Sequence, residues 1–223
     1  NNVYIYPSFS GSFVFSELLK QSDLMPYGKF RLSWAQVGSD TDPYQLGLVY
    51  TKSKFTYPGY TIGYINNSTM PNKNLKPTKT NSFELGLEMK FLKNRIGLDF
   101  TYYTQNSKNQ IMGMASSWTT GYNYRLINAG EIENKGIEIA LNTRPVQLKD
   151  FSWDLNLNFS KNSNKVKKLV DDMDMFELEK AAWLDVQVAA KVGENFGSIV
   201  GPDFKRNENG DIIVNENGLP MTV

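Results

Sequence analysis

Among the side chains of this sequence, the clustered carboxylates are the best candidates for metal ligands. They form two clusters, one made of Asp171, Asp172, Asp174, Glu177 and Glu179, the other spread from Asp203 to Glu216 around Gly210. Oxygen ligands suit Ca²⁺, but the first cluster lacks the glycine turn and the twelfth-position glutamate of a calcium loop. The second does not match that spacing either. The spacing therefore favours solvated loops over metal sites, and calcium at 203–216 stays open as a weak alternative.

Catalytic chemistry has little support in the composition. The chain has no cysteine and no histidine, which removes thiolates, disulfides, and the commonest general base and metal ligand. Glu84 and Glu88 share one face of a predicted strand and could imitate a catalytic carboxylate pair, yet a hydrated wall accounts for both. Residues 193–197 lack the Lys-Ser/Thr of a phosphate loop. We expect no enzyme activity and no cofactor.

Aromatic side chains in two long connections are the better binding candidates. Tyr57, Tyr60 and Tyr64 lie in the first, and Trp118, Tyr122 and Tyr124 lie in the second. Flat aromatic faces beside Asn, Ser and Thr suit a sugar or a peptide, through stacking and hydrogen bonds. The alternative, that these rings pack the loops together or contact a partner protein, stays equally open.

The elements that position these residues are strands, because apolar and polar residues alternate over long stretches. In 82–92 and 95–104, which only Lys93-Asn94 separates, the apolar residues recur at every second position. This period is the signature of a strand with one apolar and one polar face, and the tight connection makes a hairpin. Strands of about ten residues exceed the usual five or six and fit a tilted membrane-spanning strand.

The same alternation predicts six strands in all. They are 8–16, 29–34, 82–92, 95–104, 136–142 and 151–160. The connections alternate in length: 18–27, 93–94 and 145–150 are short, whereas 38–79, 106–126 and 162–184 are long. Outer-membrane barrels have short periplasmic turns and long extracellular loops, so this order predicts an up-and-down meander. The stretch 169–190 fits a short helix as well as a strand, and two Asn-Gly pairs predict a small hairpin around 211–214.

A soluble β-sandwich is the alternative reading of the alternation, because it also has one buried apolar face. Strand length, alternating loop lengths and aromatic residues near strand ends favour a membrane barrel instead. Mean hydropathy of −0.42 does not contradict this, since only alternate residues meet lipid. The net charge of +1, with no basic block, argues against nucleic-acid binding.

Six strands are too few for a closed barrel, which needs about eight. An open edge in lipid leaves backbone groups without hydrogen bonds, at several kcal/mol each. The sequence begins at Asn1 without a methionine and ends abruptly at Val223. We therefore expect all of 1–223 to be one partial barrel domain from a longer polypeptide.

Five ordered motifs resemble one family, the SusC/RagA-like branch of the TonB-dependent outer-membrane transporters. The stretch 72–88 is similar to its N-x-x-L-K-P-E-x-x-x-x-x-E-x-G segment, with Thr78 in place of the common glutamate. Residues 29–44 are similar to its lR-x-SW-x-x-x-G segment, and 127–138 to N-x-G-x-x-x-N-K-G-x-E. The stretches 159–166 and 192–201 complete the set.

This resemblance implies an all-β, antiparallel transmembrane barrel of 22 strands in the outer membrane of a Gram-negative bacterium. It implies uptake of oligosaccharides or peptides, a SusD-like surface lipoprotein as partner, and energy from the TonB complex through a plug domain that we do not find in 1–223. Another TonB-dependent receptor, such as a metal-chelate importer, is the nearest alternative.

Overall fold

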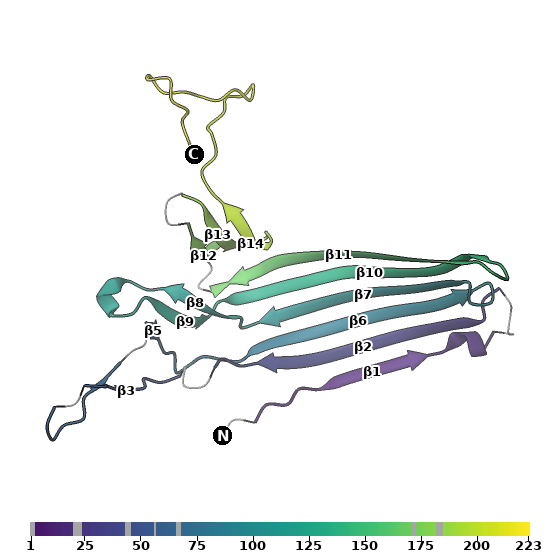
Figure 1. Cartoon of the computed structure of the whole chain (residues 1–223). Coiled ribbons are helices and arrows are strands. Elements are labelled where there is room, and N and C mark those ends of the chain that lie inside the picture. Colours follow the sequence, from purple (N-terminus) through teal and green to yellow (C-terminus); the bar gives the residue numbers. More distant parts are fainter. Residues whose placement is uncertain are drawn as a thin grey trace.

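A single curved sheet of six strands, here called the wall, forms the body of the protein (Figure 1). The structure is a computed structural model that describes residues 3–19, 24–42, 46–55, 57–65, 68–170, 173–181 and 185–223. The wall strands, in spatial order, are β1 (Ser8–Phe13), β2 (Tyr27–Ser39), β6 (Thr78–Phe91), β7 (Ile96–Lys108), β10 (Gly130–Gln147) and β11 (Ser152–Leu169). Each pairs antiparallel with its neighbour, and spatial order follows chain order. The predicted antiparallel meander is confirmed, and the sheet does not close.

Most strands are longer than the alternation predicted, and most of the extra length lies at the long-loop end, although β10 also continues past 142 to Gln147 at the short-turn end. β10 and β11 each have 18 residues, although the alternation marked out only 136–142 and 151–160. Near the long-loop end polar residues occupy both faces of the strands. The alternation of apolar and polar residues therefore disappears there, although the strands remain hydrogen-bonded to each other. β1 is the exception and ends at Phe13. The next segment turns into a 3-10 helix, η1 (Phe15–Glu17), and the Phe15 ring lies over Gly28 of β2.

The register gives the wall one apolar and one polar face. One row of paired residues crosses all six strands on the apolar face: Phe13, Phe30, Leu87, Phe100, Ile139 and Phe159. The adjacent row faces the other way: Ser12, Arg31, Gly86, Thr101, Glu138 and Ser160. Because register is a global property of the sheet, the agreement of six strands shows that every strand contributes to the same apolar surface.

The apolar surface is a band that descends across the sheet. On β1 it runs from Phe9 to Phe13, and Phe13 is level with Phe159, where the band on β11 begins before continuing to Trp153. The band thus drops by four to six residues, about 13–20 Å, over five strand spacings of about 4.8 Å. Strands tilted by about 30–40° from the normal of a flat apolar layer would produce this drop, close to the tilt of membrane barrels.

Three small sheets stand at the long-loop end. β3 (Thr51–Lys52) pairs with β4 (Gly63–Tyr64), and β9 (Tyr124–Asn128) lies between β5 (Thr69–Met70) and β8 (Ile111–Ala115). β12 (Met175–Lys180), β13 (Gln187–Lys191) and β14 (Phe196–Val200) form the third. For 169–190 the strand alternative is confirmed at Met175–Lys180 and Gln187–Lys191, whereas 182–184 lie outside the described residues. The long connections therefore contain ordered strands of their own.

The buried core lies at the long-loop end, between the loop sheets and the last residues of β11. Val166, Leu169, Phe176 and Ala190 are almost fully buried, with Met112, Met114 and Ile127 packed against them. The turn at 192–194 joins this core, since the Gly193 N–H donates to the Val166 carbonyl and the Val166 N–H to the Glu194 carbonyl. The wall is a single layer, so most of its aromatic and aliphatic side chains stay accessible. In the described ranges, no helix is both long and apolar enough to cross a membrane.

Tight reversals occur where the Asn-Gly pairs predicted them. Asn207 and Asn215 each begin a turn, and Gly210 and Gly218 adopt φ of 90° and 76°. The Asn207 Oδ1 accepts from the N–H groups of Asn209 and Asp211, each at 2.9 Å. Isolated bridges connect 204–206, 212–214 and 220–222 in place of the predicted continuous hairpin.

Candidate functional site

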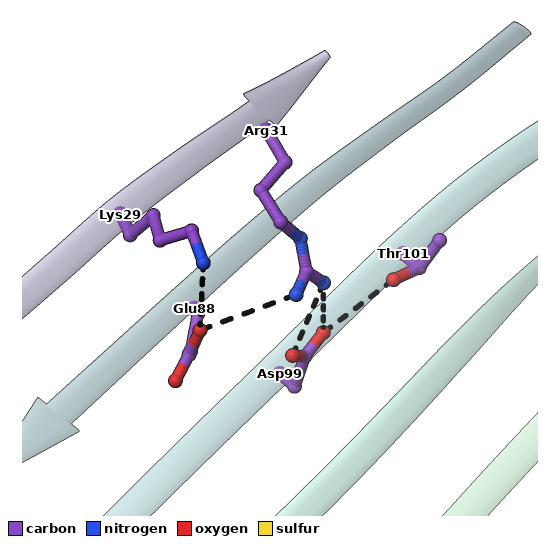
Figure 2. A network of polar contacts seen from close by, with 5 residues as sticks. All are labelled: Lys29, Arg31, Glu88, Asp99 and Thr101. Atoms are coloured by element: carbon purple, nitrogen blue, oxygen red, sulfur yellow. Dashed lines mark hydrogen bonds and ion pairs between the residues drawn. The ribbon is translucent and has the colours of Figure 1, made fainter. Parts of the chain in front are cut away.

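An ion-pair network lies on the polar face of the wall and joins three strands (Figure 2). The Arg31 Nη2 donates to both carboxylate oxygens of Asp99, at 2.8 Å to Oδ1 and 3.1 Å to Oδ2, in a bifurcated hydrogen bond. Glu88 Oε2 lies 4.0 Å from the other Arg31 terminal nitrogen and 3.8 Å from Lys29 Nζ. Thr101 donates to Asp99 at 3.4 Å. The geometry holds four charges in a polar, partly exposed layer.

Gly86 makes this network possible. Arg31 is on β2 and Asp99 on β7, so the guanidinium has to cross the intervening strand β6. Gly86 stands directly opposite Arg31, and a Cβ at that position would lie 2.7 Å from Arg31 Nε. The absence of a side chain thus leaves a passage for the arginine. Arg31 Nε is buried and, among the described residues, makes no hydrogen bond.

Shallow polar cavities adjoin the network. One of about 290 Å³ is lined by Ser10, Ser12, Arg31 and Glu84. Another, of about 380 Å³, is lined by Asp99, Glu138, Asn158 and Ser160. Hydroxyls, amides and paired charges can exchange hydrogen bonds with water or a polar solute. This face is therefore suited to line a hydrated passage and not to hold a nucleophile.

A further polar cavity lies at the short-turn end of the wall. It measures about 490 Å³ and is lined by Lys90, Arg95, Arg144 and Asp154 among others. The Arg144 Nε donates to Asp154 Oδ1 at 2.6 Å. The neighbouring turn is tight, with Leu92, Lys93 and Asn94 at positive φ.

The first group of predicted binding aromatics lies on an arm around β3 and β4. The Tyr60 N–H donates to the Tyr57 carbonyl at 2.8 Å, across a reversal in which Gly59 has φ of 83°. Tyr57 is 68% exposed and Tyr60 73% exposed, whereas Tyr64, in β4 opposite Thr51, is about half exposed. These rings are thus presented to solvent and do not pack the arm.

The second group lies on the hairpin of β8 and β9. Trp118 opens a short 3-10 helix, η2 (Trp118–Thr120), that Ser117 caps and Gly121 ends at φ of 80°. Trp118 is 82% exposed, Tyr122 is half-buried, and Tyr124 stands opposite Ala115 at the start of β9. The helix thus holds the indole out at the tip of the hairpin.

The two groups occupy the same end of the wall but separate extensions (Figure 1). The link between their segments is the parallel pairing of β5 with β9, where the Ser68 carbonyl accepts from the N–H groups of Asn123 and Tyr124 at 2.7 and 3.1 Å. Among the described residues, no ring of one group contacts a ring of the other. The structure therefore offers two aromatic patches and not one assembled pocket.

Asn128 is a structural residue that was not among the site residues predicted from the sequence. Its side chain accepts from the Lys76 N–H at 2.9 Å and donates to the carbonyls of Lys76 and Asn109 at 2.7 and 2.9 Å. Nearby, Asn72 donates to the Leu126 carbonyl. The sequence did mark these positions, because both asparagines lie in the 72–88 and 127–138 motifs. Their partners could not be read from the sequence.

The acidic clusters gain no support as metal sites. Asp171 and Asp172 lie outside the described residues, and among those described no group of three or more candidate ligands comes together. At 203–216, Asn207 and Asn215 direct their side-chain oxygens to backbone N–H groups of their own turns.

The wall, with its descending apolar band and opposite polar face, is one sector of a transmembrane β-barrel. Residues 4–183 match the family described as "TonB dependent receptor-like, beta-barrel". The chain therefore belongs to the TonB-dependent receptor β-barrel family, whose members are transporters of the outer membrane.

Individual relatives show which branch of the family the chain resembles. The chain is 30% identical over 92% of its length to TonB-dependent receptor P3 of Formosa agariphila and covers 21% of it. It is 30% identical over 71% of its length to TonB-dependent receptor SusC of Bacteroides thetaiotaomicron, covering 17% of that protein. The expected resemblance to the SusC/RagA-like branch is confirmed. The chain spans about a fifth of the length of these curated relatives.

The fold agrees. The structure of the RagAB peptide transporter matches with a TM-score of 0.76 at 17% identity, over 98% of this chain and 24% of that one. A second RagAB structure, of the peptide importer in its "closed-closed" state, matches with a TM-score of 0.75.

Proposed function

We propose that 1–223 forms part of the wall and outer loops of a SusC-like importer that carries oligosaccharides or peptides across the outer membrane. One observation carries the proposal: six strands share one apolar face, while the opposite face holds a network of paired charges. Ionised groups facing lipid near the midplane would cost about 2–4 kcal/mol each, so the polar face has to line a hydrated interior. The names SusC and RagAB peptide transporter support the substrate classes.

Orientation follows from the unequal ends of the wall. The turns at 92–95 and 148–151 are short, whereas the small sheets and both aromatic patches stand at the other end. In our proposal the Lys93-Asn94 turn lies at the periplasmic rim and the aromatic patches lie outside. A SusD-like surface lipoprotein would cover that outer end. The remaining strands of a 22-stranded barrel, and the plug that engages the TonB complex, would come from the rest of the polypeptide.

Substrate contact is assigned to the exposed aromatic residues. Trp118, Tyr57 and Tyr60 present flat faces to solvent, and Tyr64, Tyr122 and Tyr124 lie on the same two extensions and are less exposed. Stacking on such rings suits sugars, and peptides are held by the same rings together with backbone hydrogen bonds. Contact with the partner lipoprotein remains the second role for these residues.

The test is uptake by cells that carry the full-length protein. Deletion of its gene should abolish growth on one class of oligosaccharide or peptide, and re-expression should restore it. Trp118→Ala and Tyr60→Ala should weaken substrate binding by the purified protein about five- to tenfold each. Val192→Ala, half exposed on the turn after β13, is the control.

Three results would separate the roles. Loss of lipoprotein co-purification with substrate affinity intact would move the aromatic residues to the partner interface. Growth defects confined to metal-chelate media would favour the metal-chelate alternative. Extraction of the full-length protein as a soluble monomer without detergent would contradict a barrel altogether.

A further inference from the structure

The polar face of the wall ends, at the short-turn rim, in a cavity whose lining has an excess of positive charge. Its charged residues are four cations, Lys90, Lys93, Arg95 and Arg144, and one carboxylate, Asp154. Four cations against one carboxylate leave a net charge of +3. In the network at mid-wall, by contrast, Lys29 and Arg31 each have a carboxylate within 4.0 Å.

Two of these cations are direct cross-strand neighbours. The Arg144 N–H donates to the Arg95 carbonyl at 2.8 Å, where the pairing of β7 with β10 ends. Both side chains lie on the polar face, two residues along their strands from the paired Gly97 and Asn142. Like charges directly opposite each other on a sheet are destabilising. An anion held between the two guanidinium groups would remove this repulsion.

Most of the hydrogen-bond donors in the cavity are available. In the described ranges, the Arg144 side chain makes one hydrogen bond, from Nε to Asp154. Among the described residues, the Arg95 side chain makes no hydrogen bond and no ion pair. Lys90 Nζ lies 5.1 Å from the centre of the Tyr27 ring, a contact that uses none of its N–H groups on an anion. The planar fork of a guanidinium matches the two oxygens of a carboxylate.

The cavity also has room and uncharged polar partners. Its volume of about 490 Å³ lies within the range of about 300–1,000 Å³ that is usual for small-ligand sites. Gly97 keeps it open, since a Cβ there would have no atom closer than 3.8 Å. Asn142, Gln147 and Asn156 line it with amides. Because amides both donate and accept, they suit sugar hydroxyls and peptide groups equally well.

Exposure of the charges favours reversible binding. The side chains of Arg144 and Asp154 are 45% and 51% exposed. Exposed ion pairs are weak, so a second carboxylate can displace Asp154 and leave again. A charge pair that has to stay closed gains more from burial, where the low dielectric strengthens it. The exposure therefore favours a passing solute over a fixed segment of the protein.

We propose that this cavity binds a carboxylate group of the transported solute as it leaves the barrel. The carboxylate lies between Arg95 and Arg144, and the uncharged part of the solute lies against Asn142 and Asn156. The inference rests on the proposed function, because it takes the polar face as the transport path. It narrows the substrate to solutes that carry a carboxylate, such as sugar acids and peptides.

The test is isothermal titration calorimetry of the full-length protein in a neutral detergent. The probes are trigalacturonate with its uncharged methyl ester, and triglutamate with triglutamine. At least one acid should bind more tightly than its uncharged match. R95Q should weaken binding of that acid about fivefold, the upper value for one exposed ion pair, and D154N should tighten it by a similar factor because the competing carboxylate is gone. The control is K149Q, which removes the same charge from the neighbouring turn, at a residue that does not line the cavity.

Equal affinity for the acids and their uncharged matches, no loss in R95Q, or an equal loss in K149Q would overturn the proposal. Stronger displacement of the acid by inorganic phosphate than by acetate would assign the cavity to phosphate instead. Faster hydrogen exchange outside 1–223 in R95Q, with neither acid bound by the wild type, would show that the protein's own polypeptide fills the cavity. Heat-modifiable migration on gels verifies that each variant is folded. Uptake that continues without acid binding rejects this inference alone, whereas acid binding without any uptake rejects the proposed function.

Discussion

Gly86 shows how much of the polar face depends on a missing side chain. A methyl group at this position would meet Arg31 Nε at 2.7 Å, whereas at Gly97, on the same face, the nearest atom would be 3.8 Å away. Gly86→Ala should therefore displace the guanidinium from Asp99 and lower the free energy of unfolding by about 1–2 kcal/mol, while Gly97→Ala should leave it unchanged. Chemical denaturation of the full-length protein in detergent measures both. Equal effects of the two substitutions would contradict the crossing of Arg31 over β6.

Asn128 gives a second prediction at the scale of one residue. Its amide is the link through which Lys76 and Asn109 are fixed to β9. Asn128→Ala should speed hydrogen exchange at 73–78 without changing exchange in the wall strands, because only the loop loses its bonds. Asn123→Ala is the control, since in the described ranges the Asn123 side chain makes no hydrogen bond. Unchanged exchange at 73–78 would show that the β5–β9 pairing alone holds this loop.

The strands themselves make a prediction about the two faces. Leu87 belongs to the apolar row near the middle of the band, and Ser160 to the adjacent polar row. Leu87→Arg should cost about 2–4 kcal/mol of stability in a bilayer, since arginine at the midplane of a barrel's lipid face carries that penalty. Ser160→Arg should cost less than about 1 kcal/mol, because it faces hydrated space. Folding titrations into vesicles compare the two, and a larger cost at Ser160 would invert our assignment of faces.

Element by element, the sequence predicted the parts of the fold in which burial alternates with period two. The hairpin of β6 and β7 and the start of β11 were recognisable because lipid-facing Phe, Leu and Ile recur at every second position. The ends of β10 and β11 were not, since Glu133, Asn134 and Lys135 place polar groups on both faces. Apart from the strand alternative at 169–190, the short loop strands were not predicted, because two to five residues are too few to establish a period.

The candidate site was predictable in type but not in arrangement. Exposure of Trp118 and Tyr60 agrees with a binding role, yet their assignment to two separate extensions depends on the β5–β9 pairing, a contact between residues 55 apart. The network of Arg31 with Asp99 depends likewise on cross-strand register and on Gly86. Alternation gives the face of each residue and leaves its partners undetermined.

At the scale of the whole molecule, the wall has two unpaired edges, β1 and β11. In lipid each unpaired backbone group costs several kcal/mol, so residues 1–223 alone should not insert as a stable barrel. Refolded into vesicles, they should remain protease-sensitive and show no heat-modifiable band, whereas the full-length protein should show one. A protease-resistant, heat-modifiable product from 1–223 would mean that copies of this sheet close on each other.

The descending band has a geometric consequence for the complete wall. A drop of four to six residues over five strand spacings is about one residue per strand. Around 22 strands, this stagger sums to a shear of between about 18 and 26 residues. Tilt, strand number and shear together fix the radius of a closed barrel, here giving a backbone-to-backbone diameter of about 40 Å. An unobstructed opening of that width would let almost any small solute through the membrane, so a 22-stranded barrel with the stagger of these six strands needs something to fill it.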